Sequence, residues 1–316
     1  MKIIVLDGTP LNPGDLNWDA LRQLGDVTIH ERTAPDQVAE RIADAQAVLT
    51  NKVKLSAEHL AGASKLEYVG EMATGFDNID VAAARAGGIT VCNVPSYSAN
   101  FTAQTAIALL LELCHHVGLH AEAVAQGEWP QSPDFSFWKA PLIDLEGKTL
   151  TILGMGTIGR RVAKVGDALG MRIIAAQSPG RDYDSDSMHI PLSDALALAD
   201  VVSLHCPLKP ETRGLVNAEF LGQMKPSALL INTARGAIIN EADLAQALEQ
   251  GTIAGFAGDV LSAEPPSAGN PLLSAKNALI TPHIGWASRE ARQRCLQTSV
   301  DNLRAYIDGK PQNVVS

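Results

Sequence analysis

The stretch KTLTILGMGTIGR, residues 148–160, constrains the fold of this chain more than any other part of the sequence. Residues 149–153 are β-branched and apolar, which predicts a short buried strand. Three glycines follow at G-x-G-x-x-G spacing, Gly154, Gly156 and Gly159, and an amphipathic helical pattern comes after them. In such a turn the first glycine permits a tight bend, the second lets a pyrophosphate approach the backbone, and the third lets helix and strand pack closely.

The start of that helix favours phosphate binding at the turn electrostatically. Its unpaired N–H groups and positive dipole end attract an anion, so no basic side chain is needed. Glycines at this spacing also occur by chance in ordinary strand-to-helix turns. Here the strand before the turn and the helix after it, with Val162, Val165 and Leu169, supply the context that the motif requires. The stretch therefore predicts a dinucleotide site.

Composition sets the limits within which this site must work. A chain of 316 residues, 46% hydrophobic and 19% charged, is long enough for two domains with separate cores. A net charge of −10, with no block of Lys and Arg, argues against a nucleic-acid or anionic-membrane partner. The four cysteines lie far apart without a C-x-x-C pair, and the N-terminus lacks a signal-peptide pattern. We expect a reduced, cytoplasmic protein, and no metal site is predicted.

Short apolar strands alternate with helical patterns along the chain, which predicts an α/β fold with parallel sheets covered by helices on both faces. One long helix is expected from Asn100 to Val117, and a last helix from Arg289 to Ile307. Residues 127–148, rich in aromatic residues and proline, are expected to form an extended arm. Another helix is expected near residues 16–24. Strands are expected at 3–6, 27–29, 47–50, 68–69 and 89–92, and after the glycine turn at 173–176, 201–205, 229–233, 256–259 and 279–283.

This order predicts two Rossmann-like domains. Residues 1–100 and 290–316 are expected to form a discontinuous, flavodoxin-like, substrate-binding domain, because a complete α/β unit precedes the glycine turn and the last helix is expected to return to it. Residues 101–289 are expected to form the dinucleotide-binding domain. The usual place for a second ligand is the cleft between such domains, where we expect the active site.

Ligands of parallel sheets bind beyond the carboxyl ends of the strands, where Arg235, Glu264 and His283 stand out. A guanidinium can bind a carboxylate and polarise the adjacent carbonyl through two N–H donors. Histidine can give and take a proton near neutral pH, as interconversion of ketone and alcohol requires. A carboxylate on the far ring nitrogen fixes the imidazole tautomer and favours its protonated form. Singly, each residue also fits a structural role; together they suit reduction of a 2-oxo acid.

Five motifs in this order identify a resemblance to the D-isomer-specific 2-hydroxyacid dehydrogenases: G-M-G-T-I-G, H-C-P-L-K-P-E-T, N-T-A-R-G, D-V-L-S-A-E-P-P and P-H-I-G-W. The resemblance covers essentially the whole chain. Within the family the chain looks most like the D-glycerate dehydrogenases, or hydroxypyruvate reductases, through T-N-K at 50–52, A-T-G-F-D at 73–77, C-N-V-P-S-Y at 92–97 and L-E-L-C-H-H at 111–116.

The resemblance implies a catalytic set of Arg235, Glu264 and His283. It implies that backbone amides of Ala73, Thr74 and Gly75 hold the substrate carboxylate, with Asn51 and Lys52 nearby. It also suggests that the arm bearing Trp138 crosses to a partner subunit and helps to wall its active site, and that Trp286 is a further substrate contact. For Trp138, packing within a homodimer interface is the alternative. The implied cofactor contacts are Thr105, Gly154, Met155, Gly156, Thr157, Ile158, Gly159, Gln177, Ser178, Arg181, His205, Cys206, Pro207, Thr212, Thr233, Ala234, Arg235, Asp259, His283 and Gly285. Among these, Asp259 is expected to accept from the nicotinamide carboxamide, and a role as a strand cap is the alternative for His205.

The second strand of the nucleotide domain departs from the pattern of NAD-dependent relatives. They carry an acid there, which bonds the ribose hydroxyls and repels a 2′-phosphate. This chain has Gln177 instead, and Ser178 and Arg181 offer donors to a phosphate. We therefore expect NADP to be accepted, although Arg181 also fits a solvated loop residue.

These observations predict a reversible NAD(P)-dependent oxidoreductase. We expect its substrate to be hydroxypyruvate or glyoxylate, which it reduces to D-glycerate or glycolate, and we expect the protein to be a homodimer. Alternatives are another dehydrogenase of the same family, of the D-lactate or phosphite type, and a dinucleotide-sensing corepressor. Formate dehydrogenases place a glutamine before the histidine, where this chain has Pro282. Phosphoglycerate dehydrogenases often append a regulatory domain, for which the chain has no room.

Overall fold

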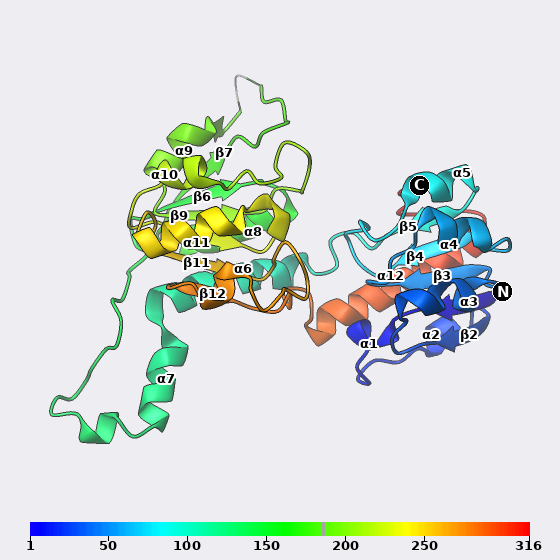
Figure 1. Cartoon of the computed structure of the whole chain (residues 1–316), viewed down its shortest axis with the longest axis horizontal. Helices are drawn as coiled ribbons and strands as arrows, with labels where there is room; N and C mark the ends of the chain where they lie inside the picture. Colours follow the sequence, from blue (N-terminus) through cyan, green and yellow to red (C-terminus); the bar gives the residue numbers. More distant parts are fainter. Residues whose placement is uncertain (185–186) are drawn as a thin grey trace. The chain divides into compact units, whose positions relative to one another are not determined.

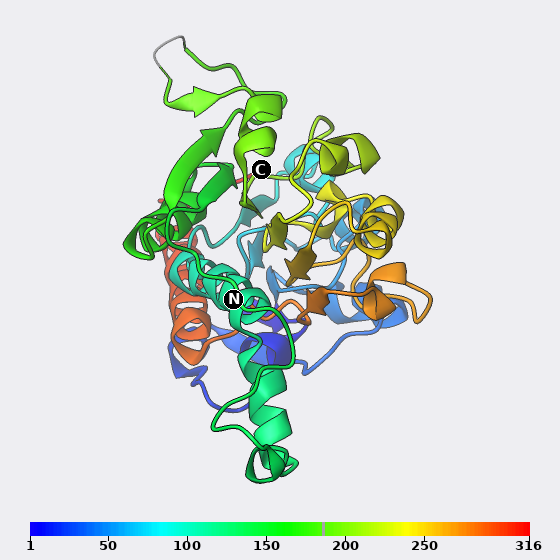
Figure 2. The same cartoon turned by 90° about the vertical axis from the view of Figure 1, so that its left-hand side faces the viewer.

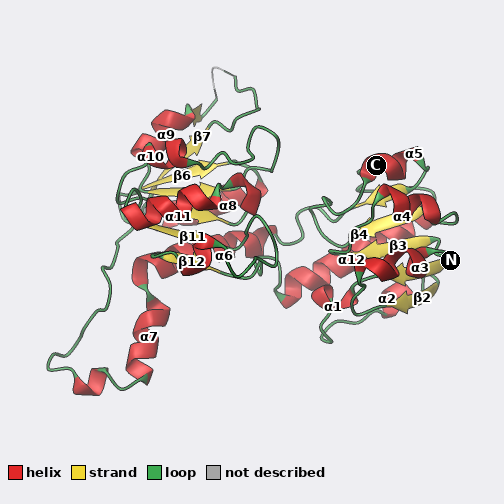
Figure 3. Cartoon of the chain, viewed as in Figure 1, coloured by secondary structure: helices red, strands yellow, loops and turns green. Residues whose placement is uncertain are grey.

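Two parallel sheets form the framework of the chain, and helices cover both faces of each (Figure 3). The computed structural model describes residues 1–184 and 187–316. The chain divides into two compact units, the first made of Met1–Ser98 and Trp286–Ser316, the second of Ala99–Gly285 (Figure 1). The second unit ends before Trp286 because this side chain packs against the hydrophobic core of the first unit.

The sheet of the first unit has the strand order β2-β1-β3-β4-β5 with parallel neighbours throughout. This is the flavodoxin-like order that was expected. Its strands are β1 (Lys2–Val5), β2 (Asp26–Ile29), β3 (Ala47–Thr50), β4 (Tyr68–Glu71) and β5 (Thr90–Cys92), and its helices are α1 (Gly8–Leu11), α2 (Asp19–Arg22), α3 (Val38–Ile42), α4 (Ala57–Gly62), α5 (Val81–Ala86) and α12 (Arg289–Ile307), with a 3-10 turn at Pro35–Gln37.

Alternating side chains send this sheet's apolar residues to two cores. Ile3 and Leu49 face a core that α1, α2 and α12 complete, whereas Ile4 and Val48 face a core made with α3, α4 and α5. Because both faces are buried there, β1 and β3 are nearly continuous apolar runs, whereas the edge strand β2 alternates exposed and half-buried residues. The last helix of the chain therefore belongs to the first unit, as the discontinuous arrangement requires.

The sheet of the second unit has the order β12-β11-β10-β9-β6-β7-β8, also parallel throughout. Counted from β6, this is the Rossmann order with one further strand at the edge. Its strands are β6 (Thr149–Leu153), β7 (Arg172–Ala176), β8 (His189–Ile190), β9 (Val201–Leu204), β10 (Leu229–Asn232), β11 (Gly255–Gly258) and β12 (Ala278–Ile280), and its helices are α6 (Ala99–His115), α7 (Val117–Ala125), α8 (Thr157–Ala168), α9 (Leu192–Leu198), α10 (Ala218–Gly222) and α11 (Glu241–Gln250), with 3-10 turns at Trp129–Gln131, Gly236–Ile238 and Pro271–Ser274.

Helices α6 and α8 bury their apolar sides on one face of this sheet, and α9, α10 and α11 cover the other. Helix α7 and the arm after it project away from the sheet of the second unit (Figures 1 and 2). Within the described residues no single helix is long and apolar enough to cross a membrane, and only the pair α6 and α7, bent by 60°, passes on length and composition together.

Two helix predictions were wrong in detail. The helix expected near 16–24 shortens to α2, because the Asn12 side chain accepts from the N–H groups of Gly14 and Leu16 and holds the segment before α2 in a turn. The single helix expected from Asn100 to Val117 breaks at His116, which adopts a left-handed φ of 48°, and α7 continues in another direction. Several strands also end one or more residues earlier than predicted.

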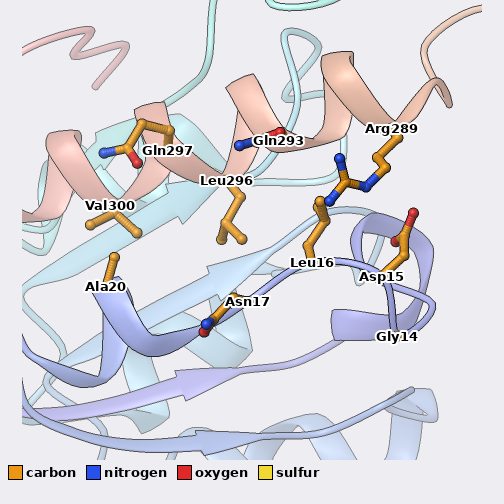
Figure 4. Close-up of a pocket in the computed structure, with 10 residues that line it drawn as sticks. All are labelled: Gly14, Asp15, Leu16, Asn17, Ala20, Arg289, Gln293, Leu296, Gln297 and Val300. Carbon is orange, nitrogen blue, oxygen red and sulfur yellow. The ribbon is translucent and has the colours of Figure 1, made fainter.

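Helix α12 is fixed to the segment after α1 by a buried arginine. Arg292 is 8% exposed, and its guanidinium donates two bonds of 2.7 Å to Asp15 and one of 3.0 Å to the Leu11 carbonyl. This side-chain bond to Arg292 lowers the pKa of Asp15. A shallow pocket beside the ion pair, lined by Leu16, Leu296 and polar side chains, separates the same two segments (Figure 4).

We expect Arg292→Ala to lower the free energy of unfolding by roughly 2–4 kcal/mol, because it removes charged hydrogen bonds and leaves buried carbonyls without a donor. Arg304→Ala is the matched control on the same helix, since the Arg304–Asp301 pair is exposed and surface pairs contribute about 0–1 kcal/mol. Urea unfolding of both variants measures the difference. Equal losses in the two variants would contradict this account of α12.

Candidate active site

Strands β10, β11 and β12 are neighbours, and the segments that follow them carry Arg235, Glu264 and His283. The structure brings the acid and the histidine together: His283 Nδ1 lies 2.6 Å from Glu264 Oε2. The other oxygen of Glu264 accepts from the N–H of Leu261 at 3.1 Å, which fixes the carboxylate. The other ring nitrogen of His283 is thus available for proton transfer, and the side chain is 29% exposed.

The Arg235 turn packs directly on the segment that leads to Glu264. Asn232, at the end of β10, accepts from the N–H of Ala234 and donates to the Arg235 carbonyl, both at 3.0 Å. A Cβ on Gly236 would overlap the backbone of Leu261, so only glycine allows the two main chains to meet here. Arg235, Glu264 and His283 therefore lie in adjoining segments, linked through Gly236, Leu261 and the Glu264–His283 bond.

Asp259 holds the segment that carries His283. It is 2% exposed; one oxygen accepts from the Thr281 hydroxyl at 2.6 Å and the Ile284 N–H at 2.9 Å, and the other from the Gly285 N–H at 2.6 Å. His283 itself has a left-handed φ of 54°. These donors occupy much of the acceptor capacity of Asp259, so its structural role is clear, and the expected contact with a carboxamide stays a prediction.

The glycine turn has the space that its spacing predicts. A Cβ on Gly154, which has a φ of 103°, would overlap the backbone of His205 and Cys206, and one on Gly159 would overlap the Gly154 carbonyl. A Cβ on Gly156 would meet nothing within 4 Å, which leaves this position open to a ligand. Helix α8 begins at Thr157, so its first N–H groups face the same opening.

The predicted contacts after β9 and β10 differ in what their side chains offer. Burial lowers the pKa of His205 to about 4, so its ring is neutral at pH 7 and bonds the Ser203 hydroxyl at 2.8 Å. Thr212 is committed to the Pro207 carbonyl and the Lys209 N–H. Thr233, by contrast, has a buried hydroxyl without a partner in the part of the chain that the structure describes, which suits a bound ligand.

Other predicted contacts are placed as follows. Met155 and Ile158 are half-buried against the core beneath the glycine turn, and Cys206 is a buried thiol whose pKa burial raises to about 11. The Thr105 hydroxyl donates to the Phe101 carbonyl within α6. Open space at Gly156, the free start of α8 and the unpartnered Thr233 hydroxyl together fit a dinucleotide.

Gln177, Ser178 and Arg181 follow β7 in an ordered turn. The Ser178 N–H donates to the Tyr183 hydroxyl at 2.9 Å, and the Arg181 guanidinium lies over the Tyr183 ring at 5.4 Å. The His189 ring stacks on the same tyrosine, with centroids 4.6 Å apart. Burial lowers the pKa of His189, and the charges of Arg181 and Arg160 lower it further, so two guanidinium groups lie near this edge.

The predicted substrate segments lie at the carboxyl edge of the first sheet. The carbonyls of Ala73 and Thr74 accept from the Val94 N–H at 2.9 Å and the Asn93 side chain at 2.7 Å. In the described part of the chain the N–H groups of Ala73, Thr74 and Gly75 meet no acceptor. A run of N–H groups with its carbonyls turned away is suited to bind an anion. Asn51 is 2% exposed, whereas the Lys52 side chain is exposed.

The two tryptophans differ in their surroundings. Trp286 is partly buried against the core of the first unit, whereas Trp138 is 69% exposed on the arm after α7. Hydrogen bonds nevertheless fix this arm, since Trp129 donates to the Phe135 carbonyl at 2.9 Å and the Lys139 N–H donates to His120 at 3.0 Å. The expected contribution of Trp138 to the active site of a partner subunit stays a prediction.

Several residues that hold the segments of the candidate site were not predicted from the sequence. Asn232 and Gly236 lie inside the N-T-A-R-G motif and could have been found there. Glu241 accepts from the Ser262 N–H and the Asn270 side chain, both at 2.7 Å, and so holds the segment bearing Glu264; no sequence signal pointed to it. Asp7, which accepts from the N–H groups of Asn51 and Lys52, follows the first strand, and this position could have indicated a role beside the site.

Comparison with known proteins places this arrangement in a family. The model of the NAD binding domain of D-isomer specific 2-hydroxyacid dehydrogenases matches residues 107–285. The chain belongs to the D-isomer-specific 2-hydroxyacid dehydrogenases. It is 44% identical to a hydroxypyruvate reductase of Blautia hydrogenotrophica, with all of both chains covered. It is 41% identical to a glycerate dehydrogenase of Methylorubrum extorquens, over 89% of this chain and 88% of that one.

A solved structure extends the likeness to three dimensions. The NADPH-dependent glyoxylate/hydroxypyruvate reductase of Sinorhizobium meliloti, in complex with NADP and malonate, is 30% identical and has a TM-score of 0.84, with 100% of this chain and 96% of that one covered. As a D-2-hydroxyacid dehydrogenase of the glycerate dehydrogenase type, the chain is an NAD(P)-dependent oxidoreductase that acts on a CH–OH group.

Proposed function

We propose that this dehydrogenase reduces hydroxypyruvate to D-glycerate, and the smaller glyoxylate to glycolate. The observation that carries the proposal is the Glu264–His283 pair beside the Arg235 turn, a constellation suited to a 2-oxo acid. The names of the similar proteins support the same substrate class. In this proposal the unit containing residues 99–285 binds the dinucleotide, and the unit containing residues 1–98 and 286–316 provides the substrate-binding segments.

The substrate would be held by charge and by N–H donors. Arg235 would bond the carboxylate and the keto oxygen of the substrate, since its guanidinium offers several donors in one plane. The N–H groups of Ala73, Thr74 and Gly75, which lack acceptors in the described chain, would bind the carboxylate, with Asn51 and Lys52 close by. With the carboxylate and the keto oxygen bound in this way, the carbonyl carbon is the position that receives the hydride.

Bound NAD(P)H supplies the hydride, and the protein supplies the proton. His283, protonated and held through Nδ1 by Glu264, would donate from its other ring nitrogen to the keto oxygen as the alcohol forms. Oxidation needs the reverse, a neutral imidazole that accepts the hydroxyl proton. Reduction should therefore slow as pH rises, and oxidation should slow as pH falls.

We expect His283→Ala to lower kcat for hydroxypyruvate reduction by about 10²–10⁴-fold, because the general acid is lost. Glu264→Gln should move the fall of reduction to lower pH, since a neutral amide no longer favours the imidazolium. Initial rates across pH with a panel of 2-oxo acids give both results. His115→Ala, at an exposed histidine of α6, is the control and should keep wild-type rates; an unchanged rate and pH profile in His283→Ala would refute the assignment.

We propose in addition that NADPH is accepted. Gln177 places no negative charge after β7, and Arg181, Arg160 and His189 surround the position where a 2′-phosphate would lie. The Glu211 carboxylate lies beside Gly180 and adds one negative charge to this edge, which the cations must outweigh. Bound NADP in the Sinorhizobium meliloti enzyme supports the same interpretation.

Arg181→Ala should raise the KM for NADPH about tenfold and leave the KM for NADH nearly unchanged, because only the phosphate contact is lost. Arg172→Ala, at the opposite end of β7, is the matched control and should change neither value. Steady-state kinetics with both cofactors measure these effects. A preference of the wild-type enzyme for NADH of about a hundredfold or more would end the proposal, since it equals nearly 3 kcal/mol of discrimination.

We also propose that the enzyme is a homodimer joined through α7 and the arm. Val117, Leu119, Trp129, Phe135 and Trp138 are all exposed apolar side chains on this single projection. The hydrogen bonds that fix the arm make it a preformed surface, and exposed apolar patches of this kind mark protein contacts. A second copy of the chain would cover it.

Phe135→Asp should convert the dimer to a monomer, because this ring is 91% exposed and contributes nothing to the monomer core. Leu198→Asp, at an exposed apolar position of α9, should leave the dimer intact. Size-exclusion chromatography with light scattering distinguishes the two states. A monomeric wild-type enzyme, or a dimeric Phe135→Asp variant, would contradict the proposed interface.

A cytoplasmic location is proposed from the cysteines. Cys92, Cys114, Cys206 and Cys295 are buried free thiols, and burial raises the pKa of each. Such thiols are unreactive core residues and suit a reducing compartment.

A further inference from the structure

Asp7 is a buried acid for which the proposed chemistry has no direct use. It follows β1 at the carboxyl edge of the first sheet and is 4% exposed. It occupies the N-cap position of α1, where aspartate normally bonds the first N–H groups of the helix. Here it makes no such bond; the N–H groups of Gly8 and Thr9 donate instead to the carbonyls of His30 and Glu31. The carboxylate is thus committed elsewhere.

Both oxygens of Asp7 bind the turn that follows β3. Oδ1 accepts from the Asn51 N–H at 2.8 Å and from the Thr50 hydroxyl at 3.1 Å, and Oδ2 accepts from the Lys52 N–H at 2.6 Å. Burial raises the pKa of Asp7, and these donors oppose that increase. A buried carboxylate with two donors on one oxygen and one on the other fixes the backbone of the turn, since each donor would be costly to leave unpaired.

The same turn is tied to the segment that follows β4. The Asn51 amide donates to the Met72 carbonyl at 2.6 Å, and the Met72 N–H donates to the Thr50 carbonyl at 2.6 Å. Met72 directly precedes Ala73, Thr74 and Gly75, whose N–H groups lack acceptors in the described chain. A displacement of the turn would therefore move the start of this N–H run.

A second buried acid, Glu71, lies near Asp7 at the carboxyl edge of the first sheet. Glu71 is the last residue of β4, is 1% exposed and accepts from the Asn78 side chain at 2.9 Å. Burial raises the pKa of Glu71 well above its ordinary value, and the charge of Asp7 adds to the increase. The donors of the 50–52 turn bind Asp7, whereas Glu71 has the Asn78 side chain as its partner.

We propose that Asp7 is a positioning residue for substrate binding: its carboxylate fixes the 50–52 turn and, through Asn51, the 72–75 segment in the geometry that receives the substrate carboxylate. The inference rests on the proposed function, because it assigns these segments to the substrate. Asp7 touches neither substrate nor cofactor. Its effect should appear in the affinity for the 2-oxo acid and not in the affinity for the dinucleotide.

Asp7→Asn tests the proposal because it keeps the size of the side chain and turns one acceptor into a donor that opposes an N–H group. We expect the KM for hydroxypyruvate to rise about 10–100-fold, with kcat and the KM for NAD(P)H within about threefold of wild type. In hydrogen exchange, the amides of Asn51 and Lys52 should lose protection. If Asp7→Asn does not fold, Asp7→Ser keeps one acceptor without the opposing donor and should show the same split.

Asp15→Asn is the matched control, since it makes the same change to a carboxylate in the same unit that bonds Arg292 and not the substrate segments. It should leave both KM values unchanged. A purely structural role for Asp7 predicts lower thermal stability with an unchanged KM for hydroxypyruvate, or an equal rise in both KM values, and either result would overturn the proposal. If the wild-type enzyme reduces no 2-oxo acid, the proposed function fails, while unchanged exchange at Asn51 and Lys52 in Asp7→Asn is what rejects the positioning role.

Discussion

Close approach of main chains at the carboxyl edge of the second sheet is the constraint on which the site depends. Gly154 lets the turn after β6 meet the backbone of His205 and Cys206, and Gly236 lets the turn after β10 meet Leu261. A side chain at either position would force neighbouring segments apart. Parallel strands bring their carboxyl ends to one edge, and these contacts help to bring the segments beyond them together.

Buried and exposed carboxylates have different tasks in this protein. Asp259 and Asp7 are almost completely buried, and backbone N–H groups and hydroxyls occupy their oxygens. They shape the segments that carry His283 and the predicted substrate contacts. Glu264 is more exposed, uses one oxygen for the Leu261 N–H and leaves the other for the imidazole. Burial thus separates acids that hold the backbone from the acid that bonds the histidine proposed as the general acid.

The histidines show the same division. Burial lowers the pKa of His205 to about 4, and the Ser203 hydroxyl orients its ring, so this histidine is uncharged at the edge where the dinucleotide is proposed to bind. His283 has a carboxylate partner and an exposed part of its ring, which proton exchange with a substrate requires. Two residues of the same type at strand ends therefore have different chemistry because their surroundings differ.

The amino-acid sequence alone predicts the two parallel sheets and the segments that carry Arg235, Glu264 and His283, because hydrophobic runs and strand-end positions are local properties of the chain. It could not determine the break at His116 or the turns at residues 12–17, where one backbone angle and the bonds of Asn12 override helical patterns. Nor could it assign Asp7 and Glu241 to their partners. These acceptors act on N–H groups far along the chain, and only tertiary structure decides which buried donors an acid meets.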